Sequence, residues 1–461
     1  MGNVYARLEE ATPEERDYAN DYLSFDDPKA RFLHAVKRGY WDGRIRLMSQ
    51  ASGIFPSGNV PQLVKAATEE LGVAPIVEDT RVCPMIPNLS ADISWLAADP
   101  KFAWQLDVVQ KAAAAQRGIL WVPTGGGKTN IAVGLAQLIP CKWLFIVHTT
   151  KLMYQAAERF EDLLGWQAGR IGDGVWSEHR FTTATFQTLW KAVRNKDPRA
   201  VALLPTIEGL FVDECHTLPA DTFFRVVMRM ANAYWRFGLS GTPLARGDKR
   251  SIYSVAALGP VVARVRAEDL FQLGVLARPK IRMLSIDQPA EYPTWQGTYG
   301  ALVVRSHLRN RTLVEAVKLA AKPCLVFVKE IRHGRVLKDA FLKSGLRCEF
   351  TWGQKANAQR DASIKSLERG DIDVLICSVI FQEGVDIPSL ASVVIACGGR
   401  SAIAAIQRIG RGTRSDGGRK QEVEVIDCYD TGNKLMARHA QERRAAYRRE
   451  SYEVTVCKPP T

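Results

Sequence analysis

The chain has 461 residues, of which 46% are hydrophobic, so it is long enough for two or three domains that each bury a core. The net charge of +13 favours a polyanionic partner without identifying it. No run of about eighteen apolar residues and no basic-then-apolar leader is present, which indicates a cytoplasmic protein with no membrane partner. The nine cysteines lack C-x-x-C spacing, which argues against a disulfide framework and a zinc site.

The first local structure that the sequence predicts is a hairpin within residues 39–47, because Asp42 and Gly43 favour a tight turn. Ile45 and Leu47 would then share one face of the second strand, and Arg44 and Arg46 the other. Two interpretations stay open for the arginines, a solubilising surface or a nucleic-acid contact. The proline-containing residues 83–87 would end this N-terminal region.

Short apolar runs predict the strands of two α/β lobes with buried parallel sheets. The runs of the first lobe are residues 119–122, 143–147, 210–212 and 237–239. The runs of the second lobe are residues 324–328, 374–377, 393–396 and 423–426. Helix-compatible stretches lie between the runs, and the proline-containing residues 277–293 would separate the lobes.

A glycine-rich loop follows the first apolar run, in the order strand, loop, helix that a phosphate-binding loop requires. Lys128 would reach the β and γ phosphates of a nucleotide, and Thr129 would supply a hydroxyl to Mg²⁺. Pro123 or Thr124 stands where the strict pattern has its first glycine, so the loop alone predicts only a nucleotide. The nucleotide-binding residues predicted here are Thr124, Gly125, Gly126, Gly127, Lys128 and Thr129.

An acidic pair at the end of the third run predicts hydrolysis of that nucleotide. Asp213 would complete the Mg²⁺ shell, and Glu214 would orient or deprotonate the attacking water. Cys215 has no specified base, so packing is favoured over a nucleophilic role. His216 is interpreted as a coupling residue that faces the Ser-Gly-Thr-Pro segment; the partners predicted for it are Ser240 and Thr242.

A basic motif near the end of the second lobe predicts groups that reach the γ phosphate from the opposite lobe. Arg411 and Arg414 would act as arginine fingers, and Gln407 precedes them in the same motif. The catalytic set predicted from the residues is therefore Lys128, Asp213, Glu214, Gln407, Arg411 and Arg414.

In this combination and order the motifs resemble those of superfamily 2 helicases of the DEAD/DEAH type, across residues 104–414. The resemblance implies two tandem RecA-like lobes that bind ATP and Mg²⁺. It also implies that Gln105 reads the adenine edge and that Gly384 and Asp386 join the nucleotide site. Residues that would hold the phosphates of one strand are Thr149, Thr150, Thr185, Gln187, Lys329, His333, Thr351 and Gln382.

The N-terminal residues 39–47, with Phe55, Pro56 and Gly58, resemble the small first domain of the UvsW-type phage branch-migration helicases. Residues 329–334 and 399–401 are similar to that family as well. The resemblance implies a small α+β domain that contacts duplex DNA beside the junction being opened. A phage or bacterial origin rests on the same resemblance.

The expected division is residues 1–90 for the DNA-contacting domain, 91–276 and 277–432 for the two lobes, and 433–461 for a basic tail. Arginines in the tail would form a solvated helix or an added phosphate contact: Arg438, Arg443, Arg444, Arg448 and Arg449.

The expected protein is an ATP-dependent helicase, monomeric on DNA, that remodels forks, Holliday junctions, D-loops and R-loops. In R-loops RNA would be a second partner. An RNA helicase and a nucleotide-gated binding or annealing protein remain alternatives.

Overall fold

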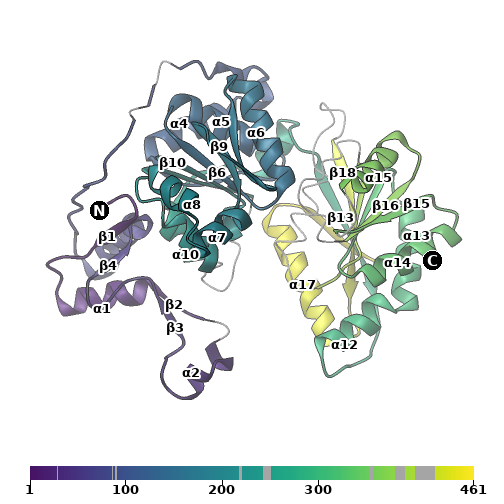
Figure 1. The fold of residues 1–461 in the computed structure, drawn as a ribbon. Helices are drawn as coiled ribbons and strands as arrows, with labels where there is room; N and C mark the ends of the chain where they lie inside the picture. Colours follow the sequence, from purple (N-terminus) through teal and green to yellow (C-terminus); the bar gives the residue numbers. More distant parts are fainter. Residues whose placement is uncertain are drawn as a thin grey trace. The chain divides into compact units, whose positions relative to one another are not determined.

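The computed structural model describes the chain except residues 28, 29, 86, 89, 90, 218–220, 242–250, 354–356, 379–389, 400–420 and 461. The chain divides into two compact units, and each is described by itself (Figure 1). The first contains Met1–Val122 and Gly127–Val265, and the second contains Pro123–Gly126 and Arg266–Thr461. Among the described residues, no helix combines the length and apolar character needed to cross a bilayer.

The first unit is built on an eight-stranded sheet in the order β12-β5-β11-β10-β6-β9-β7-β8, parallel except for the β7–β8 pair. Its strands are β5 (Arg117–Trp121), β6 (Trp143–Val147), β7 (Ala168–Gly172), β8 (Val175–Ser177), β9 (Phe181–Thr185), β10 (Gly209–Asp213), β11 (Trp235–Ser240) and β12 (Val261–Arg264). All four strands predicted for the first lobe are confirmed, because each apolar run is a buried strand.

Helices cover both faces of this sheet, and successive strand residues pack into opposite cores. One core contains Phe145 and Phe211 with helices α4, α5 and α6; the other contains Leu144 and Leu210 with α7 to α10. These helices are α4 (Trp104–Ala115), α5 (Lys128–Leu138), α6 (Thr150–Leu164), α7 (Phe186–Arg194), α8 (Pro198–Leu203), α9 (Asp221–Val227) and α10 (Ser251–Leu258). The central strands are apolar on both faces because neither face meets water.

The N-terminal region has a small core of its own and two short antiparallel pairs, β1 with β4 and β2 with β3. Its elements are β1 (Tyr5–Arg7), α1 (Pro13–Tyr22), β2 (Ser24–Asp26), η1 (Ala30–Phe32), α2 (His34–Lys37), β3 (Arg44–Arg46), β4 (Ile54–Pro56), η2 (Ser57–Asn59), α3 (Val60–Ala66) and η3 (Ala67–Leu71). Helix α1 begins with a capping box between Thr12 and Glu15.

The predicted hairpin at Asp42 and Gly43 is wrong. Strand β3 pairs with β2, in which Phe25 lies opposite Ile45, and no strand precedes Asp42 directly. Asp42 instead accepts a hydrogen bond from the backbone N–H of Arg44 at 3.0 Å, and Gly43 adopts φ 83°. The Asp-Gly pair therefore makes a local turn that ends a longer loop, rather than the tip of a hairpin.

The N-terminal region packs directly on the first sheet unit through a buried arginine. Arg117 Nη1 donates to Ser57 Oγ at 2.8 Å and to the carbonyl of Asn3 at 3.2 Å, while its Nε and Nη2 donate to carbonyls at the end of α10. A Cβ on Gly58 would lie 2.1 Å from the carbonyl oxygen of Val255, so only glycine allows this approach. The region therefore belongs to the same compact unit as the first sheet.

The second unit contains an all-parallel seven-stranded sheet in the order β15-β16-β14-β17-β18-β13-β19. Its strands are β13 (Arg278–Ile286), β14 (Cys324–Val328), β15 (Cys348–Thr351), β16 (Val374–Ser378), β17 (Ser392–Ile395), β18 (Glu422–Asp430) and β19 (Glu453–Cys457). The helical segments are α11 (Ala267–Gln272), α12 (Trp295–Tyr299), η8 (Gly300–Val304), α13 (His307–Leu319), α14 (Ile331–Lys343), α15 (Asn357–Arg369) and α17 (Lys434–Arg449). The two parallel α/β units confirm the expected RecA-like fold class.

Two segments for which the sequence predicts no strand are parts of this second sheet. Residues 277–293, predicted to separate the two series of strands at the start of the second lobe, contain β13, a strand between β18 and β19. The supposed tail contains α17, which packs on the sheet, and β19, which pairs with β13. Basic residues in β13 concealed it, but Lys280 and Arg282 form cross-strand ion pairs with Glu422 and Glu424.

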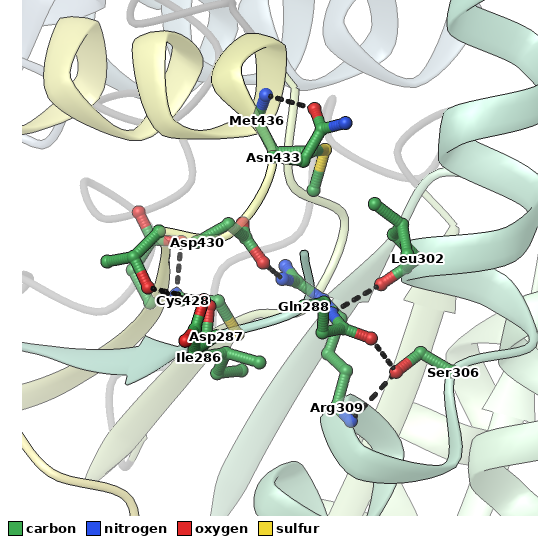
Figure 2. Close-up of polar contacts among 12 residues, drawn as sticks. Ile286, Asp287, Gln288, Leu302, Ser306, Arg309, Cys428, Asp430, Asn433 and Met436 are labelled. Atoms are coloured by element: carbon green, nitrogen blue, oxygen red, sulfur yellow. Dashed lines mark hydrogen bonds and ion pairs between the residues drawn. The ribbon is translucent and has the colours of Figure 1, made fainter. Parts of the chain in front are cut away.

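A buried polar network closes the end of β13 and β18, where Figure 2 shows Arg309 reaching from α13 toward Asp430. Ser306 caps α13 by accepting from Arg309 N at 3.0 Å, and its hydroxyl donates to Gln288. Asn433 caps α17 and donates to the carbonyl of Ala290 at 2.7 Å. These side chains accept hydrogen bonds from backbone N–H groups at the helix starts, which would otherwise be buried without partners.

Candidate nucleotide site and nucleic-acid track

The predicted motor residues of the first unit follow strands β5, β6, β10 and β11. These strands are neighbours and parallel, so their carboxyl ends meet at one edge of the sheet. Ligands of open parallel sheets bind at this edge, because the loops that leave it carry the adaptable side chains and helix N-termini.

The glycine-rich loop between β5 and α5 has the backbone of a phosphate cradle. Gly125 and Gly127 adopt φ values of 89° and 78°, and Gly126 N donates to the carbonyl of Pro123 at 3.0 Å. A Cβ on Gly127 would lie 2.4 Å from Nε2 of the buried Gln105. Gln105 therefore lies against the loop, and the loop has the glycine-dependent curvature that fits a triphosphate.

Lys128, the first residue of α5, forms an ion pair with the acidic motif. Its Nζ lies 3.1 Å from Oε1 of Glu214, which adopts φ 49° just after β10. Burial by itself would raise the pKa of Glu214, but Lys128 and His216 more than offset burial and lower it. Glu214 is therefore a carboxylate held ionised beside the loop.

Asp213 is the last residue of β10, where its carboxylate accepts the backbone N–H of Glu214 at 3.0 Å. Burial, followed by the charge of Glu214, raises the pKa of Asp213 to about 6. A divalent cation would relieve this repulsion between neighbouring carboxylates. The described residues offer no group of three or more His, Cys, Asp or Glu for a metal, but Mg²⁺ needs only one or two protein carboxylates when phosphates and water complete its shell.

A short polar network joins the acidic motif to the end of the neighbouring strand β11. His216 Nδ1 lies 3.1 Å from Ser240 Oγ and 3.2 Å from Glu214 Oε2. Ser240 Oγ lies 3.5 Å from the same Glu214 oxygen. Cys215 is fully buried in the core that contains Leu210, and burial raises the pKa of its thiol, as expected of a packing residue.

The first-unit residues expected to hold a strand's phosphates lie along the same edge. Thr149 caps α6 by accepting from Leu152 N at 3.3 Å, and Thr150 begins that helix. Thr185 ends β9 and donates to Thr188 Oγ1 at 2.8 Å, but only 5% of it is exposed. Gln187 is exposed and donates to the carbonyl of His148 at 2.8 Å.

Two second-unit residues from the same prediction cannot touch a nucleic acid in this structure. His333 is fully buried and lies 3.0 Å from Asn310 Oδ1, and Thr351 is fully buried at the end of β15. Both side chains face the core because α14 and β15 pack together there. Lys329 differs: it is exposed directly after β14, with its Nζ 5.1 Å from the centre of the Tyr299 ring.

Arg44 and Arg46 of β3 both have acidic partners in the described structure. Arg44 Nη1 lies 2.8 Å from Asp21 Oδ1, and Arg46 forms a two-point ion pair with Asp42. The strongest cause lowering the pKa of Asp42 to about 2 is this bond from Arg46. The carboxylates neutralise the basic charge that a phosphate would need.

Several predicted residues lie outside the described ranges. They are Thr242, Gln382, Gly384, Asp386, Gln407, Arg411 and Arg414.

The sequence interpretation missed the buried role of Arg443, for which it left open a solvated helix or a phosphate contact. Arg443 of α17, 1% exposed, forms a two-point ion pair with Asp427 and donates through Nη1 to the carbonyl of Gly399 at 2.6 Å. Tyr447 donates to the same Asp427 at 2.9 Å. A helix-spaced apolar stripe at Met436, Ala440 and Tyr447 was the available signal that α17 has a buried face.

Known protein families match parts of both units of the chain. Residues 96–245 match the family model for the type III restriction enzyme res subunit, and residues 309–416 match the helicase conserved C-terminal domain. The ATP-dependent DNA helicase uvsW of Enterobacteria phage T4 is 26% identical over 449 residues, which cover 89% of this chain and 86% of the relative. The DNA 3'-5' translocase XPB2 of Sulfurisphaera tokodaii is 23% identical over 70% of this chain and 80% of its own length.

The fold is also that of solved helicases. The structure of S. cerevisiae Dbp5 bound to RNA and ADP BeF3 aligns with 80% of this chain and 95% of that chain, with a TM-score of 0.54 and 15% identity. The fold and the edge site define a RecA-like nucleotide hydrolase with two parallel-sheet units. The chain belongs to the superfamily 2 helicases, and it uses ATP to drive helicase activity.

Proposed function

We propose that this helicase is a DNA translocase that remodels branched DNA, namely forks, Holliday junctions, D-loops and R-loops. The observation that carries the proposal is the extent of the similarity to the phage DNA helicase, which covers 89% of this chain. The archaeal relative, a DNA 3'-5' translocase, supports DNA as the substrate. The net charge of +13 agrees with a polyanionic track.

Hydrolysis would begin with exchange of partners at Lys128. In the described structure Lys128 is paired with Glu214 at 3.1 Å. A γ phosphate in the glycine-rich loop would draw Lys128 away, and the released carboxylate would accept a proton from the attacking water. Thr129 and Asp213 would hold Mg²⁺, which neutralises the phosphate charge that develops during the reaction. Arg411 and Arg414 would stabilise the same charge from the second unit.

Coupling to DNA would run through His216 and Ser240. Both contact Glu214, so a change at the end of β11 alters the environment of the catalytic carboxylate. Thr149, Thr150 and Gln187 would hold phosphates of one strand beside this network, and Lys329 would hold the strand on the second unit. Alternating grip on the two units during each ATP cycle would move the strand.

The test compares wild type with Lys128→Ala and Glu214→Gln, using ATP turnover and unwinding on forks, Holliday junctions, D-loops, R-loops, tailed duplexes and structured RNA. Wild type should turn over ATP faster with branched DNA, and both variants should lose at least about 10³-fold of that turnover while circular dichroism stays unchanged. Turnover like wild type in either variant contradicts the hydrolysis mechanism. Equal unwinding of plain tailed duplexes contradicts the preference for branches, and stronger stimulation by RNA reassigns the substrate.

A further inference from the structure

The loop between β2 and β3 combines basic charge with exposed aromatic side chains. Residues 29–41 include four Lys or Arg residues and three aromatic residues, but no Asp or Glu. Phe32 is 64% exposed and Tyr40 is 80% exposed, the two highest values among the described aromatic residues, and Leu33 is 44% exposed. Figure 1 shows the short helix α2 at the end of the β2–β3 ribbon. We name residues 30–41 the α2 loop.

The α2 loop is ordered by its backbone, so its aromatic side chains are exposed in a defined conformation. Asp27 N donates to the carbonyl of Gly43 at 2.9 Å and closes the base of the loop. Tyr40 N and Trp41 N both donate to the carbonyl of Ala35, and Trp41 Nε1 donates to the carbonyl of Arg44 at 2.9 Å. Trp41 therefore anchors the loop, while large parts of the Phe32 and Tyr40 side chains are accessible to a partner.

The basic side chains that the structure describes in the α2 loop, unlike those of β3, are not held in ion pairs with described acidic residues. Lys37 and Arg38 are exposed and form no ion pair within the described part of the chain. Arg44 and Arg46 are instead tied to Asp21 and Asp42. A phosphate that approaches this region would meet Lys37 and Arg38 without first displacing a carboxylate.

We propose that the α2 loop is the nucleic-acid contact of the N-terminal region. Phe32 and Tyr40 stack on bases that are unstacked at the branch, and Lys37 and Arg38 hold the adjoining phosphates. Aromatic side chains suit this role because every base presents a face for stacking, and an intact duplex leaves only its terminal pairs accessible. The inference rests on the proposed function on branched DNA and assigns part of its recognition to a named surface.

The proposal is tested on the full chain with two double variants, Phe32→Ala/Tyr40→Ala and Lys37→Gln/Arg38→Gln. The matched controls are Tyr5→Ala, whose side chain is 50% exposed in the same region, and Arg194→Gln/Lys196→Gln, which removes the same charge at the end of α7. The probe is a DNA fork with 2-aminopurine at the branch nucleotide, compared with a blunt duplex and a single strand of the same sequence. ATP turnover on the single strand reports the motor separately.

The aromatic double variant should bind the fork about tenfold more weakly, lose the fluorescence change at the branch and keep single-strand-stimulated turnover. The charge variant should lower the slope of log affinity against log salt by about 2. Wild-type fork affinity in both variants, or equal weakening on the blunt duplex, overturns the assignment. If no DNA stimulates ATP turnover by the wild type, that result contradicts the proposed function. The binding data on the variants test only the α2 loop, so the two failures can be told apart.

Discussion

His333 illustrates how the environment of one side chain reverses its interpretation. The resemblance to helicases implies that His333 holds a phosphate, but it is buried against Asn310. Burial, followed by the charge of Arg309, lowers the pKa of His333 to about 3. An unfolded histidine has a pKa of about 6.5, so the unfolded chain gains a proton first as the solution is acidified. The stability that neutral, buried His333 contributes is present above about pH 6.5, and it is lost as the pH falls toward the pKa of His333 in the folded protein.

The first prediction follows from this titration. Between pH 7.5 and 5.5 the wild type should lose about 1.4 kcal/mol more stability than His333→Gln, which has no proton to gain. Urea unfolding of both proteins at the two pH values measures the difference. The stability of each protein at pH 7.5 is the reference for its loss at pH 5.5. Parallel losses in the two proteins would show that His333 does not carry the acid sensitivity.

At the scale of elements, α17 is a structural part of the second unit because its central arginine is buried in a satisfied ion pair. Arg443→Ala would leave Asp427 buried without its charged partner, which costs about 3 to 5 kcal/mol. Arg448 lies five residues later on the same helix and is exposed, so Arg448→Ala should change stability by less than about 0.5 kcal/mol. Chemical unfolding of both variants provides the measurement, and equal effects would contradict the buried-pair interpretation.

The docking of the N-terminal region on the first sheet predicts a steric defect. A Cβ on Gly58 would meet the carbonyl oxygens of Val255 and Ala256 at 2.1 and 2.5 Å. Gly58→Ala should therefore separate the region from α10, which limited proteolysis detects as earlier cleavage after η2. In Gly300→Ala the new Cβ meets only the Arg305 side chain at 3.5 Å, an ordinary contact, so this control should resist cleavage as the wild type does. Identical protection of both variants would argue against tight docking.

At the scale of the whole molecule, ATP binding should stabilise the folded chain because the glycine-rich loop exists only when β5 and α5 are folded. A non-hydrolysable ATP analogue with Mg²⁺ at about 100 times its Kd adds about 2.7 kcal/mol. Lys128→Ala should lose most of the resulting shift in melting temperature, whereas the exposed Lys191→Ala on α7 should keep it. Removal of Mg²⁺ with a chelator should reduce the wild-type shift. An undiminished shift in Lys128→Ala would contradict the assigned phosphate contact.

Eight of the fifteen described strands of the two sheets could be predicted from the sequence, because a buried strand made of apolar residues appears as an uninterrupted apolar run. Residues 143–147 and 324–328 are strands with the predicted limits. Strands at or near the sheet edges escaped this signal, since β13 and β15 alternate polar and apolar residues. The prolines of residues 277–293 hide β13 in the same way, and the arginines of α17 make a buried helix resemble a basic tail.

By itself the sequence determined the fold class and the nucleotide chemistry, because a glycine-rich loop, a strand-end carboxylate and their order along the chain are local properties. Only the tertiary structure decided which polar residues are available. Side chains distant in sequence pair Arg44 with Asp21, bury His333 beside Arg309 and tie Arg443 to Asp427, whereas Phe32 and Tyr40 remain exposed. Burial and charge compensation depend on neighbours that the fold brings together, so they cannot be read from the spacing of residues along the chain.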